Sequence, residues 1–275
     1  MIRRFAAAAG TTAAGVLGWS LFESQWVELR DLEVPLYGLP PELDGLTVVH
    51  LSDFHLGTLS FNGRTLRKAV RWANESPCDF VVLTGDLLSR QRGERELREA
   101  ISALRPRHGV FAVLGNHDVD VTRDPFSTPT DASVVKASGA VLLENDSVVR
   151  EVNGRSVQIA GGDPRLGEYW YQLAHLADPA ADLRILLFHF PDVVRYLPPR
   201  SFDLILAGHL HGGQICVPTP RGKVRLEHLR APYWEGAHRT PAGMLHVSRG
   251  LGASFVPFRF LARPEATRLV LRSAG

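Results

Sequence analysis

The sequence has few cysteines and almost no excess of charge. Its two cysteines, Cys78 and Cys216, lie far apart and form no C-x-x-C spacing, which argues against a zinc–thiolate or redox motif and favours two buried free thiols. The formal net charge is only +2, so the chain as a whole lacks the basic character of a nucleic-acid-binding protein. We therefore expect no nucleic-acid partner.

Several common cofactor and nucleophile motifs are also absent. The sequence contains neither a Walker-type phosphate loop nor a G-x-S-x-G nucleophile elbow. Gly250-Leu251-Gly252 begins like a dinucleotide fingerprint, but Phe255 stands where the third glycine is required and no βαβ unit follows. The sequence therefore does not indicate binding of a nucleotide cofactor.

One uncharged stretch lies between residues 5 and 22, after a short basic lead. Its length is about the minimum for a membrane span, although its Ala, Gly and Thr content makes it weakly apolar. We expect residues 1–25 to be an uncleaved membrane anchor; a cleaved export signal and an incidental helix are the alternatives. Positive charge before the stretch and Glu23 after it favour a main domain on the outer side of the cytoplasmic membrane.

The rest of the chain is interpreted as one connector and one domain. Residues 26–45 are interpreted as a connector, because Pro35, Pro40 and Pro41 block a regular helix. The folded domain is expected over residues 46–275. A chain of 275 residues with 45% hydrophobic content can bury one sizeable core.

The first half of this domain alternates short apolar runs with amphipathic helical patterns. Such runs are typical of strands buried on both faces, and they begin at Leu46, Phe80 and Val110. Residues 66–73 and 97–104 place their apolar side chains at helical spacing. This alternation favours βαβ units and a parallel sheet.

The second half is richer in strands. Asn153-Gly154 predicts a β-hairpin within residues 148–160. Further strands are predicted at 183–188, 204–207, 244–247 and 267–271. We therefore predict an α/β (α+β) domain in which two mixed β-sheets pack face to face, with helices on the outside.

Carboxylate, amide and imidazole side chains follow five of the predicted strands, each where the strand ends. The five motifs are Asp53-Phe54-His55, Gly85-Asp86, Gly115-Asn116-His117-Asp118, His189 and Gly208-His209-Leu210-His211. Because the carboxyl ends of strands form the ligand crevice of an open α/β sheet, these side chains can converge on one place. Their chemistry suits divalent zinc, manganese or iron. The sequence therefore predicts a catalytic metal site.

A histidine by itself is more often structural than functional. Five of the eleven histidines fall within the motifs above, and we interpret the others as structural or solvent-exposed: His50, His108, His175, His228, His238 and His246. The apolar segment 256–261 contains one arginine, Arg259. We interpret this segment as an edge that covers the core, with apposition to a bilayer as the alternative.

As a set, the motifs resemble those of the calcineurin-like metallophosphoesterase family, and the resemblance extends from Asp53 to about Leu271. The stretches 211–214 and 246–252 resemble its bacterial, membrane-associated phosphodiesterase branch. The resemblance implies the four-layer fold of that family and a hydrolase acting on phosphoric ester or anhydride bonds.

The resemblance also implies a role for each motif residue. One divalent ion (Mn, Zn or Fe) would bind Asp53, His55, Asp86 and His211, and a second would bind Asp86, Asn116, His189 and His209. A hydroxide shared by the two ions would attack phosphorus. His117 would then protonate the leaving oxygen, and Asp118 would orient His117.

We therefore expect a hydrolase of a phosphodiester or pyrophosphate bond, acting on a small-molecule or lipid-linked substrate near a membrane. A metal-dependent nuclease or a phosphomonoesterase is the alternative, although a nuclease would need a basic groove that the sequence does not show. A non-catalytic metal-binding module is disfavoured, because such a descendant usually loses a ligand or the catalytic histidine, and Asp86, Asn116 and His117 are all present.

Overall fold

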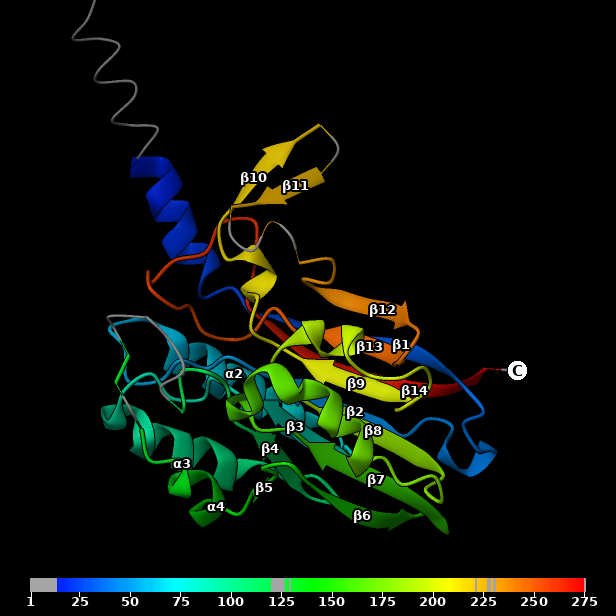
Figure 1. Ribbon diagram of the computed structural model, residues 1–275. Helices are drawn as coiled ribbons and strands as arrows, with labels where there is room; N and C mark the ends of the chain where they lie inside the picture. Colours follow the sequence, from blue (N-terminus) through cyan, green and yellow to red (C-terminus); the bar gives the residue numbers. More distant parts are fainter. Residues whose placement is uncertain are drawn as a thin grey trace, which may run out of the picture.

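The computed structural model describes residues 14–119, 127–128, 130–220, 222–226, 229 and 231–274. In this part of the chain, two six-stranded mixed sheets lie face to face, and a two-stranded hairpin projects from one end (Figure 1). The hairpin consists of β10 (Cys216–Thr219) and β11 (Gly222–Arg225). The two-sheet α/β architecture confirms the predicted fold class.

The first sheet has the order β1, β14, β2, β3, β4, β5. The bounds are β1 (Glu28–Tyr37), β14 (Glu265–Ala274), β2 (Thr47–Leu51), β3 (Phe80–Thr84), β4 (Val110–Val113) and β5 (Val141–Leu142). Strands β2 to β5 are parallel, as the βαβ pattern predicts. Strand β14 runs antiparallel to β2 and parallel to β1.

The second sheet has the order β12, β13, β9, β8, β7, β6. The bounds are β12 (Gly236–Thr240), β13 (Gly243–Val247), β9 (Leu204–Ala207), β8 (Leu183–Leu187), β7 (Arg155–Gly161) and β6 (Asp146–Val152). Its four central strands are parallel, and an antiparallel strand closes each edge. β6 and β7 form the hairpin predicted at Asn153-Gly154.

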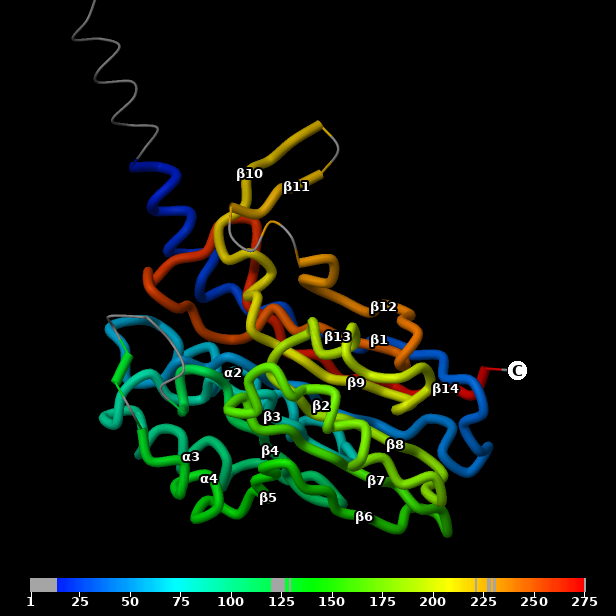
Figure 2. The backbone as a smooth tube through the Cα atoms, in the orientation of Figure 1, coloured from blue at the N-terminus to red at the C-terminus, as the bar shows by residue number. Residues whose placement is uncertain are grey.

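The position of β1 corrects one interpretation of the sequence. Residues 28–37 are not a connector, because all ten pair with β14 over its whole length (Figure 2). The prolines of this region exclude a helix but not a strand at the edge of a sheet, where the backbone needs a partner on one side only. Pro35 lies in such an edge strand.

The main apolar core lies between the two sheets and contains residues from both, including Val48, Phe80, Phe111, Ile185 and Leu206. The helices α2 (Asn62–Glu75), α3 (Glu94–Ala103) and α4 (Ser133–Ala137) pack a second cluster onto the outer face of the first sheet. Short 3-10 segments within 164–176 and 191–195 cover the second sheet. Cys78 and Cys216 are buried free thiols, as predicted.

Residues 14–23 form a helix that packs beside the segment preceding β14 (Figure 1). The carbonyl of Ser20 accepts from the Arg259 N–H (3.2 Å), and the Glu23 carboxylate accepts from the Ala262 N–H (2.7 Å). Among the described residues, no helix combines the length and the apolar character that a membrane crossing needs. Residues 1–13 of the predicted anchor lie outside the described residues.

Candidate metal centre

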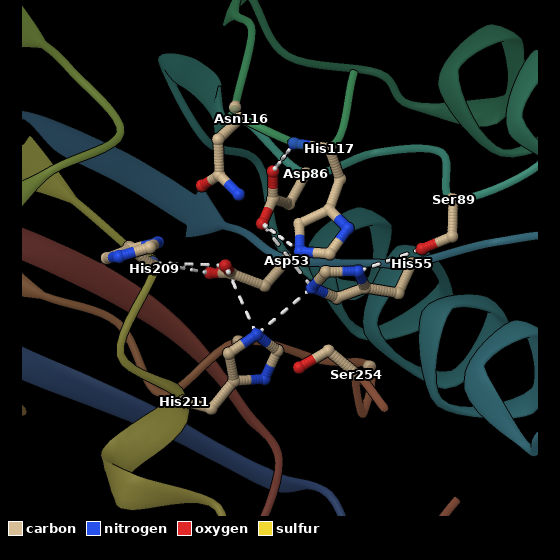
Figure 3. Close-up of polar contacts among 12 residues, drawn as sticks. Asp53, His55, Asp86, Ser89, Asn116, His117, His209, His211 and Ser254 are labelled. Atoms are coloured by element: carbon tan, nitrogen blue, oxygen red, sulfur yellow. Dashed lines mark hydrogen bonds and ion pairs between the residues drawn. The ribbon is translucent and has the colours of Figure 1, made fainter. Parts of the chain in front are cut away.

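The five sequence motifs meet where the parallel strands end (Figure 3). Asp53 and His55 follow β2, Asp86 follows β3, and the other motifs follow β4, β8 and β9. Each of the seven predicted metal ligands lies close to at least one other predicted ligand, and most of them are almost completely buried. The structure therefore brings together the side chains that sequence reasoning selected.

One group consists of Asp53, His55 and His211, whose potential ligand atoms lie within 4.8 Å of one another. The Nε2 atoms of His55 and His211 are 3.0 Å apart, and His211 Nε2 is 3.5 Å from Asp53 Oδ1. Asp86 Oδ2 lies 3.5 Å from His55 Nε2. These are the four side chains expected to share the first ion.

A second group consists of Asp86, His189 and His209. His189 Nε2 lies 3.2 Å from Asp86 Oδ2 and 3.2 Å from His209 Nδ1. The Asn116 side-chain oxygen is 3.1 Å from His189 Nε2. These are the four side chains expected to share the second ion, and Asp86 lies between the two groups.

His117 lies beside Asp86 and completes a third group with His55. Its backbone N–H donates to Asp86 Oδ1 (2.9 Å), while its Nε2 lies 3.9 Å from Asp86 Oδ2. The His117 and His55 rings meet nearly at right angles, with centroids 4.7 Å apart. The His117 imidazole therefore faces the centre of the cluster, where it can exchange a proton with a bound group.

Many residues of the cluster adopt a left-handed backbone conformation, which is uncommon for residues other than glycine. The residues are Asp53 (φ 53°), His55 (46°), Asp86 (52°), His209 (75°) and His211 (50°). Strained conformations of this kind persist where the surrounding structure enforces them, and they concentrate at functional sites. The backbone thus turns these side chains inward at a local energetic cost.

Burial controls the protonation of the cluster. Burial raises the pKa of Asp53 to about 6, and the nearby Asp86 carboxylate adds to the increase. Burial lowers the pKa of His55 to about 3 and that of His211 well below its usual value. Burial also opposes protonation of His189, but the Asp86 and Asp53 carboxylates and the Thr84 carbonyl together outweigh it and raise the pKa to about 9. His55 and His211 are therefore neutral at pH 7, the form that binds metal.

Four of the histidine rings also have a partner at Nδ1, which the sequence analysis missed. The pairs are His55 with Ser89 Oγ (3.0 Å), His117 with Ser127 Oγ (2.7 Å), His189 with the Thr84 carbonyl (2.8 Å) and His211 with Arg259 Nη2 (3.1 Å). Such partners fix the orientation of a ring and thereby the direction of its other nitrogen. No motif spacing signals them, because they come from separate loops.

Arg259 is completely buried beside the cluster. Its guanidinium group donates to the carbonyls of Gly252, Ala262 and His211, and burial lowers its pKa to about 9. Neither interpretation of segment 256–261 assigned the arginine this position. The available signal was a lone charge in an apolar segment, since a buried charge needs several hydrogen-bond partners.

Asp118 has a different role from the one predicted. Its carboxylate accepts from the backbone N–H groups of Leu87 (2.9 Å), Leu88 (2.9 Å) and Gly115 (2.8 Å). Ser127, instead, contacts the Nδ1 of His117. The expectation that Asp118 orients His117 was therefore wrong: the carboxylate ties together the two loops that follow β3 and β4.

None of the other histidines that the structure describes belongs to the three ligand groups. His50 and His246 are buried, with their Nδ1 atoms 2.9 Å apart, whereas His175 is exposed. His228 lies outside the described residues. The described members fit the structural or solvent-exposed roles assigned to them.

Comparison with known proteins gives consistent results. Residues 46–213 match the calcineurin-like phosphoesterase family. The metallophosphoesterase YkuE of Bacillus subtilis is 32% identical over 98% of this chain and 94% of its own length. The transmembrane protein with metallophosphoesterase domain of Danio rerio is 30% identical over 89% of this chain and 57% of its own. The UDP-2,3-diacylglucosamine pyrophosphatase LpxG of Chlamydia muridarum is 28% identical over 92% of each chain.

Proposed function

The chain belongs to the calcineurin-like phosphoesterase family, and we propose that it cleaves a phosphodiester or pyrophosphate bond with two metal ions. Membership makes the protein a hydrolase of phosphoric esters. The observation that carries the two-metal proposal is the overlap of the three ligand groups, because Asp86 belongs to two of them and lies between the predicted ion positions.

The donor set fits two divalent cations. Asp53 and Asp86 are at most 1% exposed, and isolated carboxylates are costly to bury. Convergent imidazole nitrogens, carboxylate oxygens and one amide oxygen suit manganese, zinc or iron. Cations held among them would offset the buried negative charge, and would also reverse the effect of burial on the pKa of Asp53.

Two such cations, when bound, would lower the pKa of a shared water and neutralise phosphate charge. The protein would add proton transfer and orientation. The Ser127 hydroxyl can donate to His117 Nδ1, which leaves the imidazole proton on Nε2. That proton points toward Asp86 and the centre of the cluster. His117 is therefore placed to protonate the oxygen that leaves phosphorus.

The substrate class proposed is a small-molecule or lipid-linked phosphoester rather than a nucleic acid. Support comes from LpxG, whose name specifies a pyrophosphatase acting on a diacylated sugar nucleotide. Further support comes from the helix at residues 14–23, where Trp19 and Phe22 are about half exposed. Exposed aromatic side chains of this kind are common where a protein meets a membrane interface.

The proposed location is the outer side of the cytoplasmic membrane, with attachment through the N-terminal segment. The basic lead and uncharged stretch support attachment, and the relative from Danio rerio is named as a transmembrane protein. External protease added to intact cells would test the orientation. Resistance of the domain before lysis, and cleavage after it, would contradict the outward orientation.

Metal content and activity together test the mechanism. His117→Ala should retain two metal ions but lose on the order of 10²–10⁴ in kcat on bis-p-nitrophenyl phosphate, whereas Asp86→Ala should lose metal as well. His175→Ala, which removes an exposed histidine, is the matched control and should behave as the wild type. Full activity of His117→Ala would refute its assigned role, and one ion per wild-type chain would refute the two-metal proposal.

A further inference from the structure

A pocket of about 270 Å³ opens beside the metal centre. Its apolar lining consists of Leu59, Ala253, Phe255, Val256 and Pro257, and we call it the side pocket. Thr58, Ser60, Arg90 and Arg92 complete its wall. None of these residues belongs to the metal cluster, so the side pocket is a separate feature of the protein.

Three chain segments form the side pocket, and each is tied to the cluster. Residues 58–60 begin three positions after His55, whose carbonyl accepts from Thr58 Oγ1 (3.1 Å). Residues 90–92 follow Ser89, the partner of the His55 ring. The third segment, 253–257, begins at Ala253, whose carbonyl accepts from the same Asn62 amide that donates to the His55 carbonyl.

Further contacts fix the third segment against the cluster. The Gln214 side chain donates to the Ser254 carbonyl (2.8 Å) and accepts from the Ser254 N–H (3.0 Å). Phe255 has a left-handed backbone (φ 55°), and its ring centroid lies 6.4 Å from that of His117. The side pocket therefore adjoins the place where His117 would meet the leaving oxygen.

The side pocket differs chemically from the cluster beside it. Leu59 is 87% exposed and Phe255 is 50% exposed, so two large apolar side chains border its mouth in contact with water. A ligand that covers them would gain hydrophobic free energy, at about 25 cal/mol per Å² of buried apolar surface. The arginines at the wall would favour the anionic end of the same ligand.

The third segment leads from the side pocket to the helix at residues 14–23. The backbone N–H of Arg259, four residues after Phe255, bonds to the helix at Ser20. That helix exposes Val16, Leu17, Trp19 and Phe22. The third segment thus links the side pocket to a helix that also exposes apolar side chains.

We propose that the side pocket binds an aliphatic chain of the substrate, next to the phosphate that the metal centre cleaves. The proposal rests on the proposed function and specifies its substrate class: an amphiphile with an anionic phosphoester and a flexible apolar chain. Nucleoside esters, by contrast, would place a flat polar base against a lining that is mostly apolar.

Two diesters that differ only in chain length test the proposal: methyl and decyl 4-nitrophenyl phosphate, each below its micelle concentration. The purified, manganese-loaded protein should show a kcat/KM for the decyl ester that is higher by roughly tenfold or more, because each buried methylene contributes about 0.8 kcal/mol. Leu59→Asn should reduce the decyl-to-methyl ratio severalfold, and its high exposure makes a folding defect unexpected. Val256→Asn provides a second variant in the same pocket.

Val149→Asn is the matched control, because it changes an apolar residue that is 48% exposed on β6, away from the pocket. This variant should retain the wild-type ratio. Equal rates for the two esters, an unchanged ratio in both pocket variants, or preference for thymidine 5′-(4-nitrophenyl) phosphate over the decyl ester would overturn the proposal. Absence of hydrolysis with every diester and pyrophosphate would instead refute the proposed function itself.

Discussion

Replacing Asp118 by asparagine separates two roles that this residue could have. In the structure its carboxylate braces the loops after β3 and β4 through three backbone N–H groups. Removal of the brace should lower the stability of the fold. Had Asp118 oriented the His117 ring instead, the same change would lower kcat and leave stability almost unaltered.

The size of the effect follows from the hydrogen bonds. Oδ2 of Asp118 accepts from Gly115 N–H (2.8 Å), and Oδ1 accepts from Leu87 and Leu88 (2.9 Å each). An amide keeps only one acceptor oxygen, so at least one buried N–H loses its partner and faces an NH₂ group. An orphaned buried donor costs about 1–3 kcal/mol, and hydrogen bonds to a charge are stronger than neutral ones. We therefore expect Asp118→Asn to lower the free energy of unfolding by about 2–4 kcal/mol.

Thermal unfolding in excess chelator measures this loss without a contribution from metal binding. The melting temperature should fall by roughly 5–10 °C. The matched control is Ser127→Ala, which removes the partner of His117 Nδ1; it should keep the melting temperature within about 2 °C but reduce kcat. A wild-type melting temperature for Asp118→Asn, combined with a kcat as low as that of His117→Ala, would refute the proposal that the Asp118 carboxylate braces the two loops.

Three further predictions concern the cluster and its surroundings. Gly115→Ala should reduce the metal content measured by elemental analysis, because the new Cβ would clash with the Asp86 carboxylate. The control is Gly18→Ala, whose Cβ has no neighbour within 4 Å and which should keep the wild-type metal content. Manganese affinity, measured by calorimetry, should weaken as pH falls below about 9, because a proton competes for His189, and by up to about tenfold more per unit below about 6, where a proton also competes for Asp53. An affinity equal at pH 5 and pH 7 would contradict this. Arg259→Leu should lower the free energy of unfolding by roughly 3 kcal/mol or more, since several buried carbonyls lose their donor; an unchanged melting temperature would count against it.

Sequence reasoning identified most of the cluster because the chemistry is encoded locally. Asp53 and Asp86 follow short apolar runs, and both runs are central strands whose ends must meet. The hairpin at Asn153-Gly154 and the helices α2 and α3 are local features as well. The spacing of apolar residues and the residues at the turns determine such elements, so a single sequence is enough to predict them.

Features that depend on distant partners were not predicted. Residues 28–37 contain proline and were interpreted as a connector, since a parallel edge strand needs β14, more than 220 residues away, to define it. Asp118 was predicted to orient the ring of its neighbour in sequence, His117. Its carboxylate instead accepts hydrogen bonds from backbone N–H groups of another loop. The burial of Arg259 also depends on three segments that only the folded chain brings together.

The place of β14 between β1 and β2 has a consequence for synthesis on the ribosome. All five motifs emerge before residue 265, yet β1 and β2 then lack the strand that joins them. Until residues 265–274 are translated, the nascent chain presents two open strand edges, which are prone to pair with other chains. A premature stop before Glu265 would therefore yield a protein with every predicted ligand and an unfinished sheet. Such a product should aggregate or be degraded rather than accumulate as an active enzyme.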